Sequence, residues 1–207
     1  MPATDRQTHW NTVHATKAEN EVSWFQAEPA HSLELIRAAG ATPGSAIIDI
    51  GGGASRVVDA LLAAGYRDLT VLDLAAPALD RARARLGAAA AGVAWIAADV
   101  TAWSPPRRYD IWHDRAAFHF LTEAADRAAY LAALRQALHP GGHAVIATFA
   151  PDGPEKCSGL PILRYDPPGL AAALGPGFAL LEARGHLHTT PFGTVQSFQF
   201  SLFRREG

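Results

Sequence analysis

Three aspartates follow short apolar runs, at positions where a carboxylate could meet a ligand. Asp49 lies in "AIIDI", Asp73 in "VLDL" and Asp99 in "AADV", and a glycine triplet, residues 51–53, follows the first run. Glycine lets the backbone turn sharply and lets a ligand approach closely, while a carboxylate attracts cations and accepts hydrogen bonds. The pattern therefore predicts a site for a ligand that carries hydrogen-bond donors and positive charge.

The glycine triplet does not fit the common phosphate-binding loops. A dinucleotide fingerprint counted from Gly51 ends on glycine or alanine, but that position is Arg56. Asp49 would repel a pyrophosphate at the loop, whereas it would attract a cation. No Gly-Lys-Ser/Thr sequence follows, which excludes a P-loop. A dehydrogenase is disfavoured for the same reasons.

The other two aspartates fit an adenosine. Asp73 lies about 20 residues after Gly53, where α/β folds place a carboxylate that accepts both ribose hydroxyls. Asp99 could accept from the adenine amine while the backbone N–H of Val100 donates to the ring. An adenosine with a positive charge and no phosphate suits all three acids, and S-adenosylmethionine has that shape. Taken singly, Asp49 could instead cap a helix, Asp73 could serve a turn, and Asp99 could be a surface acid.

The elements that must position these residues alternate along the chain. Short apolar runs, which predict buried strands, alternate with helix-like runs that end at glycine or proline. This order predicts an α/β fold with a parallel sheet and helices on both of its faces. The last two strand-like runs have no helix between them and predict an antiparallel pair. The predicted strands are 46–50, 69–74, 93–100, 109–114, 143–150, 178–188 and 195–205, and the predicted helices are 29–39, 55–65, 77–87, 123–138 and 169–175.

Five ordered segments resemble the motifs of one enzyme family, the class I S-adenosylmethionine-dependent methyltransferases. "IIDIGGGAS" is similar to the first motif, with Ser55 where many members have a third glycine. "VLDL", "AADV", "YDIWHDRAAFHFL" and "LHPGGHAVIATF" are similar to the second, third, fourth and post-helix motifs, in the family's order. The resemblance is close over residues 30–150 and holds in outline elsewhere.

The resemblance implies a Rossmann-like, mostly parallel sheet of seven strands that ends in an antiparallel hairpin. It implies one domain over residues 1–207, with an aromatic N-terminal lid in 1–30, a cofactor-binding core in 45–150, and a substrate-side loop and hairpin in 151–207. It also implies that Asp49, Gly51 and Gly53 face the methionine part of the cofactor. Asp73 would bind the ribose with Leu74 against the adenine, and Asp99 and Val100 would bind the adenine edge.

The end of the fourth strand would face the sulfonium in this family. It supplies His113, Asp114, Arg115 and His119. Asp114 or His119 could accept a proton from an incoming nucleophile or orient it, and Asp114 is also expected to contact the cofactor. The alternative is that His113 packs under the sheet while Asp114 and Arg115 pair with each other.

Aromatic residues in the polar N-terminal segment predict a lid. Trp10, Trp24 and Phe25 precede the sheet, and Trp10 and Trp24 are expected to cover the cofactor, where an aromatic face can attract a sulfonium. The segment resembles the Trp-x3-Tyr…Trp-Tyr/Phe opening of some small bacterial methyltransferases, with His14 in place of the tyrosine. Simple hydrophobic capping of the core is the alternative.

Composition limits the partners. The chain has 18 Lys+Arg against 20 Asp+Glu and no basic stripe, so nucleic acid is not expected as a partner. It shows neither the apolar core of a signal peptide nor a run of about 20 apolar residues, so we expect a cytoplasmic protein that does not bind membranes. Cys157 is the single cysteine, and His186 and His188 share a strand face without a third ligand, so no metal site is expected.

The prediction is therefore S-adenosylmethionine-dependent methyl transfer to a small-molecule nucleophile, by a monomer or homodimer. The long connection 151–165, which carries Cys157, Arg164 and Tyr165, could line the substrate pocket. Protein lysine methylation and a non-catalytic module that only binds S-adenosylmethionine remain as alternatives.

Overall fold

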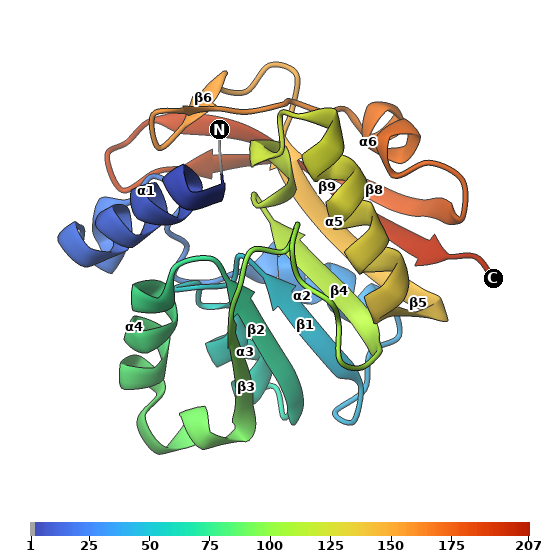
Figure 1. The fold of residues 1–207 in the computed structure, drawn as a ribbon, viewed down its shortest axis with the longest axis horizontal. Helices are drawn as coiled ribbons and strands as arrows, with labels where there is room; N and C mark the ends of the chain where they lie inside the picture. The colour runs from blue at the N-terminus through green and yellow to red at the C-terminus, as the bar shows by residue number, and fades with distance from the viewer. Residues whose placement is uncertain (1–2) are drawn as a thin grey trace.

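The computed structural model describes the backbone of residues 3–207 and the side chains from Asp5 onward. Its main feature is a seven-stranded sheet in the order β3-β2-β1-β4-β5-β9-β8 (Figure 1). The strands are β1 Ala46–Ile50, β2 Asp68–Asp73, β3 Val93–Ala97, β4 Tyr109–Arg115, β5 Leu138–Phe149, β8 Phe178–Thr189 and β9 Val195–Arg205.

The directions of the strands agree with the sequence pattern. The pairs β1–β2, β1–β4, β2–β3 and β4–β5 are parallel, whereas β9 runs antiparallel to both β5 and β8. The predicted Rossmann-like sheet with a C-terminal antiparallel hairpin is thus confirmed. Strand order reverses between β1 and β4, because the chain first builds outward through β2 and β3 and then returns to the other side of β1. In open α/β sheets this switch point is where ligands bind.

Helices cover both faces of the sheet because its strands are apolar on both sides. All five residues of β1 are buried, and their side chains alternate between two core clusters, with Ile47 in one and Ile48 in the other. The first cluster includes residues of α2 (Ala30–Ala38), α3 (Val57–Ala63) and α4 (Ala76–Leu86), and the second includes residues of α5 (Ala124–Ala137) and α6 (Pro167–Leu174).

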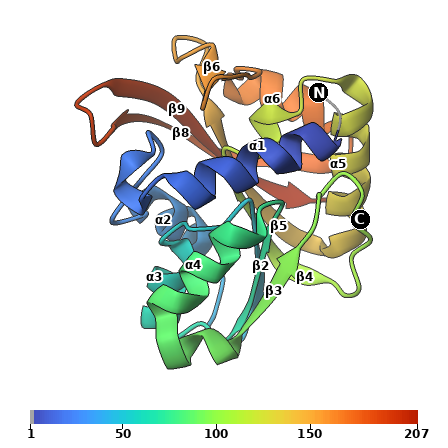
Figure 2. The same cartoon turned by 60° about the vertical axis from the view of Figure 1, so that its left-hand side comes forward.

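A further helix, α1 (Ala3–Thr16), lies across the edge of the sheet and packs beside α4 (Figure 2). A short 3-10 turn, η1 (Glu19–Glu21), follows it. The sequence pattern of this segment does not predict a helix, because charged and polar residues are spread around the helix axis. None of the helices in the described part of the chain has the length and apolarity needed to cross a membrane.

The long connection after β5 is ordered by short contacts. It forms a two-stranded ladder, β6 (Lys156–Cys157) with β7 (Leu160–Pro161), which turns the chain back over the same edge of the sheet. The backbone N–H of Leu163 donates to the carbonyl of His119, and that of Tyr165 donates to the carbonyl of Phe149. Cys157 is buried by this arrangement.

Candidate active site

A cavity lies at the carboxyl ends of β1, β2, β3 and β4, at the point where strand order reverses. Residues of α1 and of the turn that carries Cys157 also line it. It brings together residues from segments that are far apart in the sequence: Arg6, Trp10, His14, Trp24, Asp49, Ile50, Gly51, Gly52, Ala54, Ser55, Leu72, Asp73, Leu74, Ala98, Asp99, Val100, Arg115, Ala116, Ala117, Phe120, Leu121, Cys157 and Phe198.

Most of the predicted cofactor residues share this cavity. Those that line it are Trp10, Trp24, Asp49, Gly51, Asp73, Leu74, Asp99 and Val100. Gly53 and Asp114, which the sequence also favours, are not among the described residues of its wall.

The glycine triplet leaves room for the two carboxylates below it. A Cβ at Gly52 would lie 2.5 Å from Oδ2 of Asp49, and a Cβ at Gly53 would collide with Oδ2 of Asp73. Gly51 and Gly53 have φ values of 64° and 28°, in the region that glycine adopts without strain. Gly52 lines the cavity. Gly53 does not line it but packs directly against the carboxylate of Asp73.

Asp49 is held by one oxygen and open at the other. Its Oδ1 lies 2.6 Å from Nδ1 of His113, which donates to it, and Nε2 of His113 lies 2.9 Å from the hydroxyl of Ser32 on α2. The Oδ2 atom is buried and has no hydrogen-bond partner among the described residues. A buried carboxylate oxygen without a donor is costly, so a ligand that brings a donor or a positive charge would be stabilised there.

Asp73 is buried at the end of β2 with 8% of its surface exposed. Its Oδ1 accepts from the backbone N–H of Ala75 at 2.7 Å. Burial, and then the charge of Asp49, raise the pKa of Asp73 to about 7, against backbone hydrogen bonds from Ala75 and Gly53 that lower it. Two close carboxylates in one cavity favour a cationic ligand that also donates hydrogen bonds.

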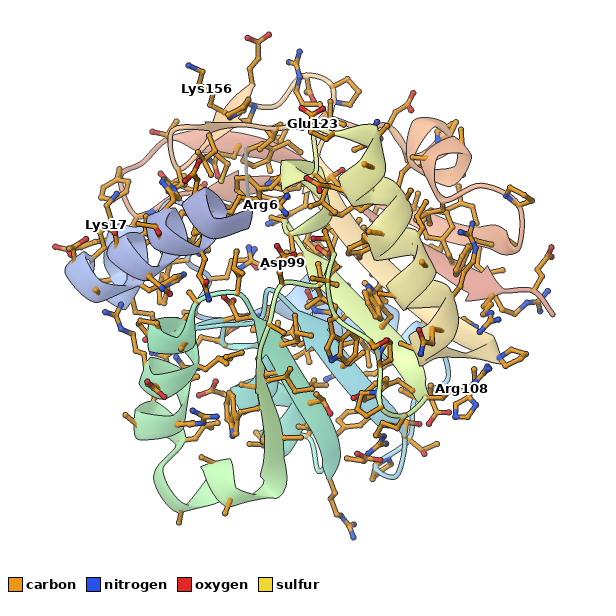
Figure 3. The ribbon with its side chains drawn as sticks, in the orientation of Figure 1. Arg6, Lys17, Asp99, Arg108, Glu123 and Lys156 are labelled. Atoms are coloured by element: carbon orange, nitrogen blue, oxygen red, sulfur yellow. The ribbon has the colours of Figure 1, made fainter. Side chains whose placement is uncertain are left out.

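Asp99 is bound by an arginine from α1. Its Oδ1 accepts from the backbone N–H and the hydroxyl of Thr101 at 2.9 and 2.7 Å. Its Oδ2 lies 3.0 Å from Nη2 of Arg6, and Figure 3 shows Arg6 and Asp99 facing each other. Nη1 of Arg6 lies 2.5 Å from Oδ2 of Asp126 on α5. Arg6 therefore ties α1 to the residue predicted to bind the adenine and to the start of α5.

One face of α1 forms the upper wall of the cavity. Arg6, Trp10 and His14 are four residues apart and so lie on the same side of the helix. The ring of Trp10 meets those of Trp24 and Phe120 edge to face, with centroids 5.7 and 5.0 Å apart. The i, i+4 spacing of these three residues places them on one face only because the segment is helical, which the sequence pattern does not predict.

The predicted catalytic Asp114 is not among the residues that line the cavity. It is fully buried on the α5 side of the sheet, where Oδ2 accepts from the hydroxyl of Tyr130 at 2.7 Å. Backbone N–H groups of Ala117 and Phe118 donate to Oδ1 at 2.8 and 3.3 Å. Burial raises its pKa to about 6, against these hydrogen bonds. The carboxylate thus fixes the turn that follows β4.

His119 is also fully buried, and its ring packs against Phe120 and Phe149. Both ring nitrogens are without a partner among the residues described, and burial, followed by the charge of Arg115, lowers its pKa to about 3. The structure therefore brings neither His119 nor Asp114 to the cavity wall, where an acceptor would have to meet them.

Two titratable groups of the cavity wall are neutral near pH 7. Burial, and then the nearby Arg81, lower the pKa of His14 to about 4, while burial raises the pKa of Cys157 to about 12. The wall also includes Arg115, which sequence analysis noted but did not place in the site. Phe120 and Phe198 are further wall residues that no motif singles out.

The residues of the cavity fit S-adenosylmethionine. The free Oδ2 of Asp49 and the glycine backbone suit the cationic methionine end, and Asp73 suits the ribose hydroxyls. Leu74 and Val100 provide apolar surface for the adenine beside Asp99. The same set of carboxylates would repel a pyrophosphate.

Comparison with known proteins agrees with this fit. Residues 47–142 match the family described as a methyltransferase domain. The chain is similar to 1,6-didemethyltoxoflavin-N1-methyltransferase of Burkholderia thailandensis, with 20% identity, a TM-score of 0.74, and coverage of 99% of this chain and 89% of that one. That protein was crystallised with 1,6-didemethyltoxoflavin and S-adenosylhomocysteine. No curated protein sequence matched the chain.

Two other solved structures are similar over nearly the whole chain. One is the N-methyltransferase NodS of Bradyrhizobium japonicum with S-adenosylhomocysteine, with 18% identity, a TM-score of 0.72, and coverage of 95% and 98%. The other comes from work on the conversion of a disulfide bond into a thioacetal group in echinomycin biosynthesis, with 20% identity, a TM-score of 0.75, and coverage of 95% and 90%.

The chain thus shares the fold of these S-adenosylmethionine-dependent methyltransferase structures. The match to the methyltransferase domain covers strands β1 to β4 and the loops at their carboxyl ends, which form much of the cavity wall.

Proposed function

We propose that this enzyme transfers the methyl group of S-adenosylmethionine to a small-molecule nucleophile. The carrying observation is that side chains from distant segments of the chain line the cavity beside the predicted cofactor contacts. We call this part the acceptor half. It is lined by Arg115, Phe120, Cys157 and Phe198, together with Trp24, which is also a predicted cofactor contact. A concave, mostly apolar site of this kind favours a compact acceptor over a folded protein or a nucleic acid.

The bound cofactor would supply a methyl group on a positively charged sulfur, and transfer is an in-line displacement. The chain would act mainly by holding the two reactants in line and by excluding water. Trp10 and Trp24 would cover the reacting centre, and their ring faces would attract the sulfonium. Asp49, oriented by His113, would hold the cationic end of the cofactor.

Apart from Asp49, Asp73 and Asp99, which we assign to the cofactor, the cavity wall has no described side chain well suited to removing a proton from the acceptor. His14 is neutral near pH 7 but its lowered pKa makes it a weak base. Cys157 keeps its proton because its pKa is raised. An acceptor that is already nucleophilic at neutral pH, rather than one that must be deprotonated in the site, therefore suits this arrangement.

A screen for methyl-donor consumption tests the proposal. The protein would be incubated with S-adenosylmethionine and, in turn, with small thiols, amines, phenols and chalcogen anions, while S-adenosylhomocysteine is measured. Rapid product formation with one small acceptor, and none with lysine peptides or unfolded protein, is the expected result. Turnover on lysine peptides alone would support the protein methyltransferase instead. Cofactor binding without turnover on any acceptor would support the non-catalytic module.

A further inference from the structure

A single arginine projects into the acceptor half from the end of β4. Arg115 is the last residue of that strand and pairs with Ala147 of β5. The next residue, Ala116, has φ 68°, a conformation that residues other than glycine rarely adopt. Strain of this kind persists only where the surrounding structure requires it, and it is common at functional sites. The strained residue thus directly follows Arg115 at the end of β4.

The guanidinium of Arg115 has few partners. Its Nη2 donates to the backbone carbonyl of Trp24 at 2.9 Å. Its Nε is buried and makes no hydrogen bond in the described part of the chain. Arg115 also forms no ion pair with any described carboxylate. The charge of Asp49 acts on it from a greater distance and raises its pKa, but burial has the larger effect and lowers it.

Two other arginines with little solvent exposure have anionic partners. Arg6 binds two carboxylates, at 3.0 and 2.5 Å. Arg85 also binds two, those of Glu19 and Asp59, at 3.0 and 2.6 Å. Because a guanidinium stays charged in proteins, its burial is costly unless an anion accompanies it. Arg115 is partly buried at a ligand cavity, with a buried Nε, and has no such anion among the described residues.

The titratable side chains around Arg115 do not provide a negative charge that could pair with its guanidinium near pH 7. Cys157 lies near enough for Arg115 to lower its pKa, yet burial still raises that pKa to about 12, so the thiol stays neutral. Burial, with a smaller effect from the charge of Arg115, lowers the pKa values of His186 and His188, so both are neutral near pH 7 and carry no negative charge. The remaining walls of the acceptor half are aromatic. Asp49 is the nearby acid, and the cationic end of the cofactor would occupy it.

We propose that Arg115 binds an anionic group of the methyl acceptor, so that the acceptor is a small organic anion with a carboxylate or similar oxyanion and an apolar, planar body. This inference rests on the proposed function and narrows its substrate class. The guanidinium suits a carboxylate because it offers several N–H donors in one plane. The aromatic side chains of Trp24, Phe120 and Phe198 suit the apolar body. A cationic lysine side chain would be repelled by the same residue.

The experiment measures binding of matched probes to the protein saturated with S-adenosylhomocysteine. Benzoate and 2-naphthoate would be titrated by calorimetry, each against its neutral amide. The wild-type protein should bind at least one carboxylate about tenfold or more tightly than its amide, as expected for a charged hydrogen-bonded pair. Arg115→Gln should abolish this preference, and Arg115→Lys should keep part of it. Arg107→Gln, which removes an exposed arginine paired with Asp68 on another part of the surface, should leave it intact.

The affinity of each variant for S-adenosylhomocysteine distinguishes a role of Arg115 in binding the acceptor from a role in binding the cofactor. In Arg115→Gln, S-adenosylhomocysteine should bind within about threefold of the wild type. The inference would be overturned if Arg115→Gln bound S-adenosylhomocysteine tenfold or more weakly but still preferred the carboxylate probe over its amide. That result would show that Arg115 binds the cofactor. Equal binding of acid and amide would also overturn it. So would the absence of detectable binding of either compound at a probe concentration of about 50 mM. Failure of the wild type to bind S-adenosylhomocysteine at all would instead refute the proposed function. Melting temperatures of both Arg115 variants close to that of the wild type would exclude misfolding as the cause.

Discussion

Replacing Asp73 by asparagine should make the cofactor-free protein more stable at high pH while weakening its cofactor binding. The carboxylate is buried at the end of β2, and its pKa is raised from 3.8 to about 7. The folded state therefore binds a proton more tightly than the unfolded state does. Between these two pKa values the free energy of unfolding falls as pH rises, and above pH 7 the loss is complete. Since one pKa unit corresponds to about 1.4 kcal/mol, ionised Asp73 destabilises the empty fold by up to about 4 kcal/mol.

Asparagine cannot ionise, so the Asp73→Asn variant lacks this part of the pH dependence. It loses one backbone hydrogen bond, because its amide nitrogen cannot accept, and this costs about 1 kcal/mol at every pH. Relative to wild type, the variant should be slightly less stable near pH 4.5 and about 1–3 kcal/mol more stable at pH 8, after both terms are combined. Urea unfolding of both proteins without cofactor, at pH 4.5, 6 and 8, measures this difference.

The cofactor should show the opposite effect. Removing the charged acceptor for the ribose hydroxyls should raise the Kd for S-adenosylhomocysteine at pH 8 by about 10- to 100-fold. Asp80→Asn, which changes an exposed aspartate on α4, is the control and should change neither property. A stability difference between wild type and Asp73→Asn that does not vary with pH would refute the reasoning. Unchanged cofactor affinity would remove Asp73 from the ribose site.

Three other substitutions follow from the contacts of α1 and β4. Arg6→Ala should raise the Kd for S-adenosylhomocysteine about 3- to 30-fold, because α1 loses its ion pairs to Asp99 and Asp126; calorimetry measures this, and unchanged affinity would show that Arg6 does not secure the lid. Trp10→Ala should remove most of the change in tryptophan fluorescence on cofactor binding, and an undiminished change would show that Trp10 does not cover the cofactor. Asp114→Asn should lower the free energy of unfolding by about 1–3 kcal/mol and turnover by less than tenfold, because the carboxylate binds Tyr130 and backbone N–H groups; a fall in turnover of 10³-fold in a stable variant would return Asp114 to the chemistry.

The sheet and the meeting of three carboxylates in one cavity could be predicted because both depend on local sequence. A buried parallel strand needs a continuous apolar run, and β1 shows this plainly in Ala46–Ile50. The carboxyl ends of parallel strands meet at one edge, so acids at the ends of such runs must lie close together. Asp49, Asp73 and Asp99 therefore reach one cavity, as their positions in the sequence indicate.

The side chains at the end of β4 could not be placed in the same way. Successive residues of a strand face opposite sides, so His113 points to Ser32 on α2 while Asp114 points to Tyr130 on α5. The sequence does not say which of these directions leads to the ligand. In the structure Arg115 lines the cavity, whereas Asp114 is held by Tyr130 and by the backbone N–H of Ala117 and does not line it.

The helix α1 could not be predicted because its stability comes from distant residues. Arg81 of α4 donates to the backbone carbonyls of His14 and Lys17 and so satisfies the last turn of the helix. Arg6 binds acids more than 90 positions away in the sequence. A polar helix held by such contacts shows little periodicity of its own.

Cys157 gives the enzyme a built-in reporter of its acceptor half. It is the chain's single cysteine, and its side chain lines the cavity, so a thiol reagent would label one known position without engineered mutations. The raised pKa makes the resting thiol a slow nucleophile, and alkylation would proceed mainly when the surrounding turn opens. The labelling rate therefore measures how often reagents can enter, and a molecule that fills the acceptor half would protect the thiol. A small fluorinated tag on this sulfur would let NMR follow the arrival of candidate acceptors, one compound at a time.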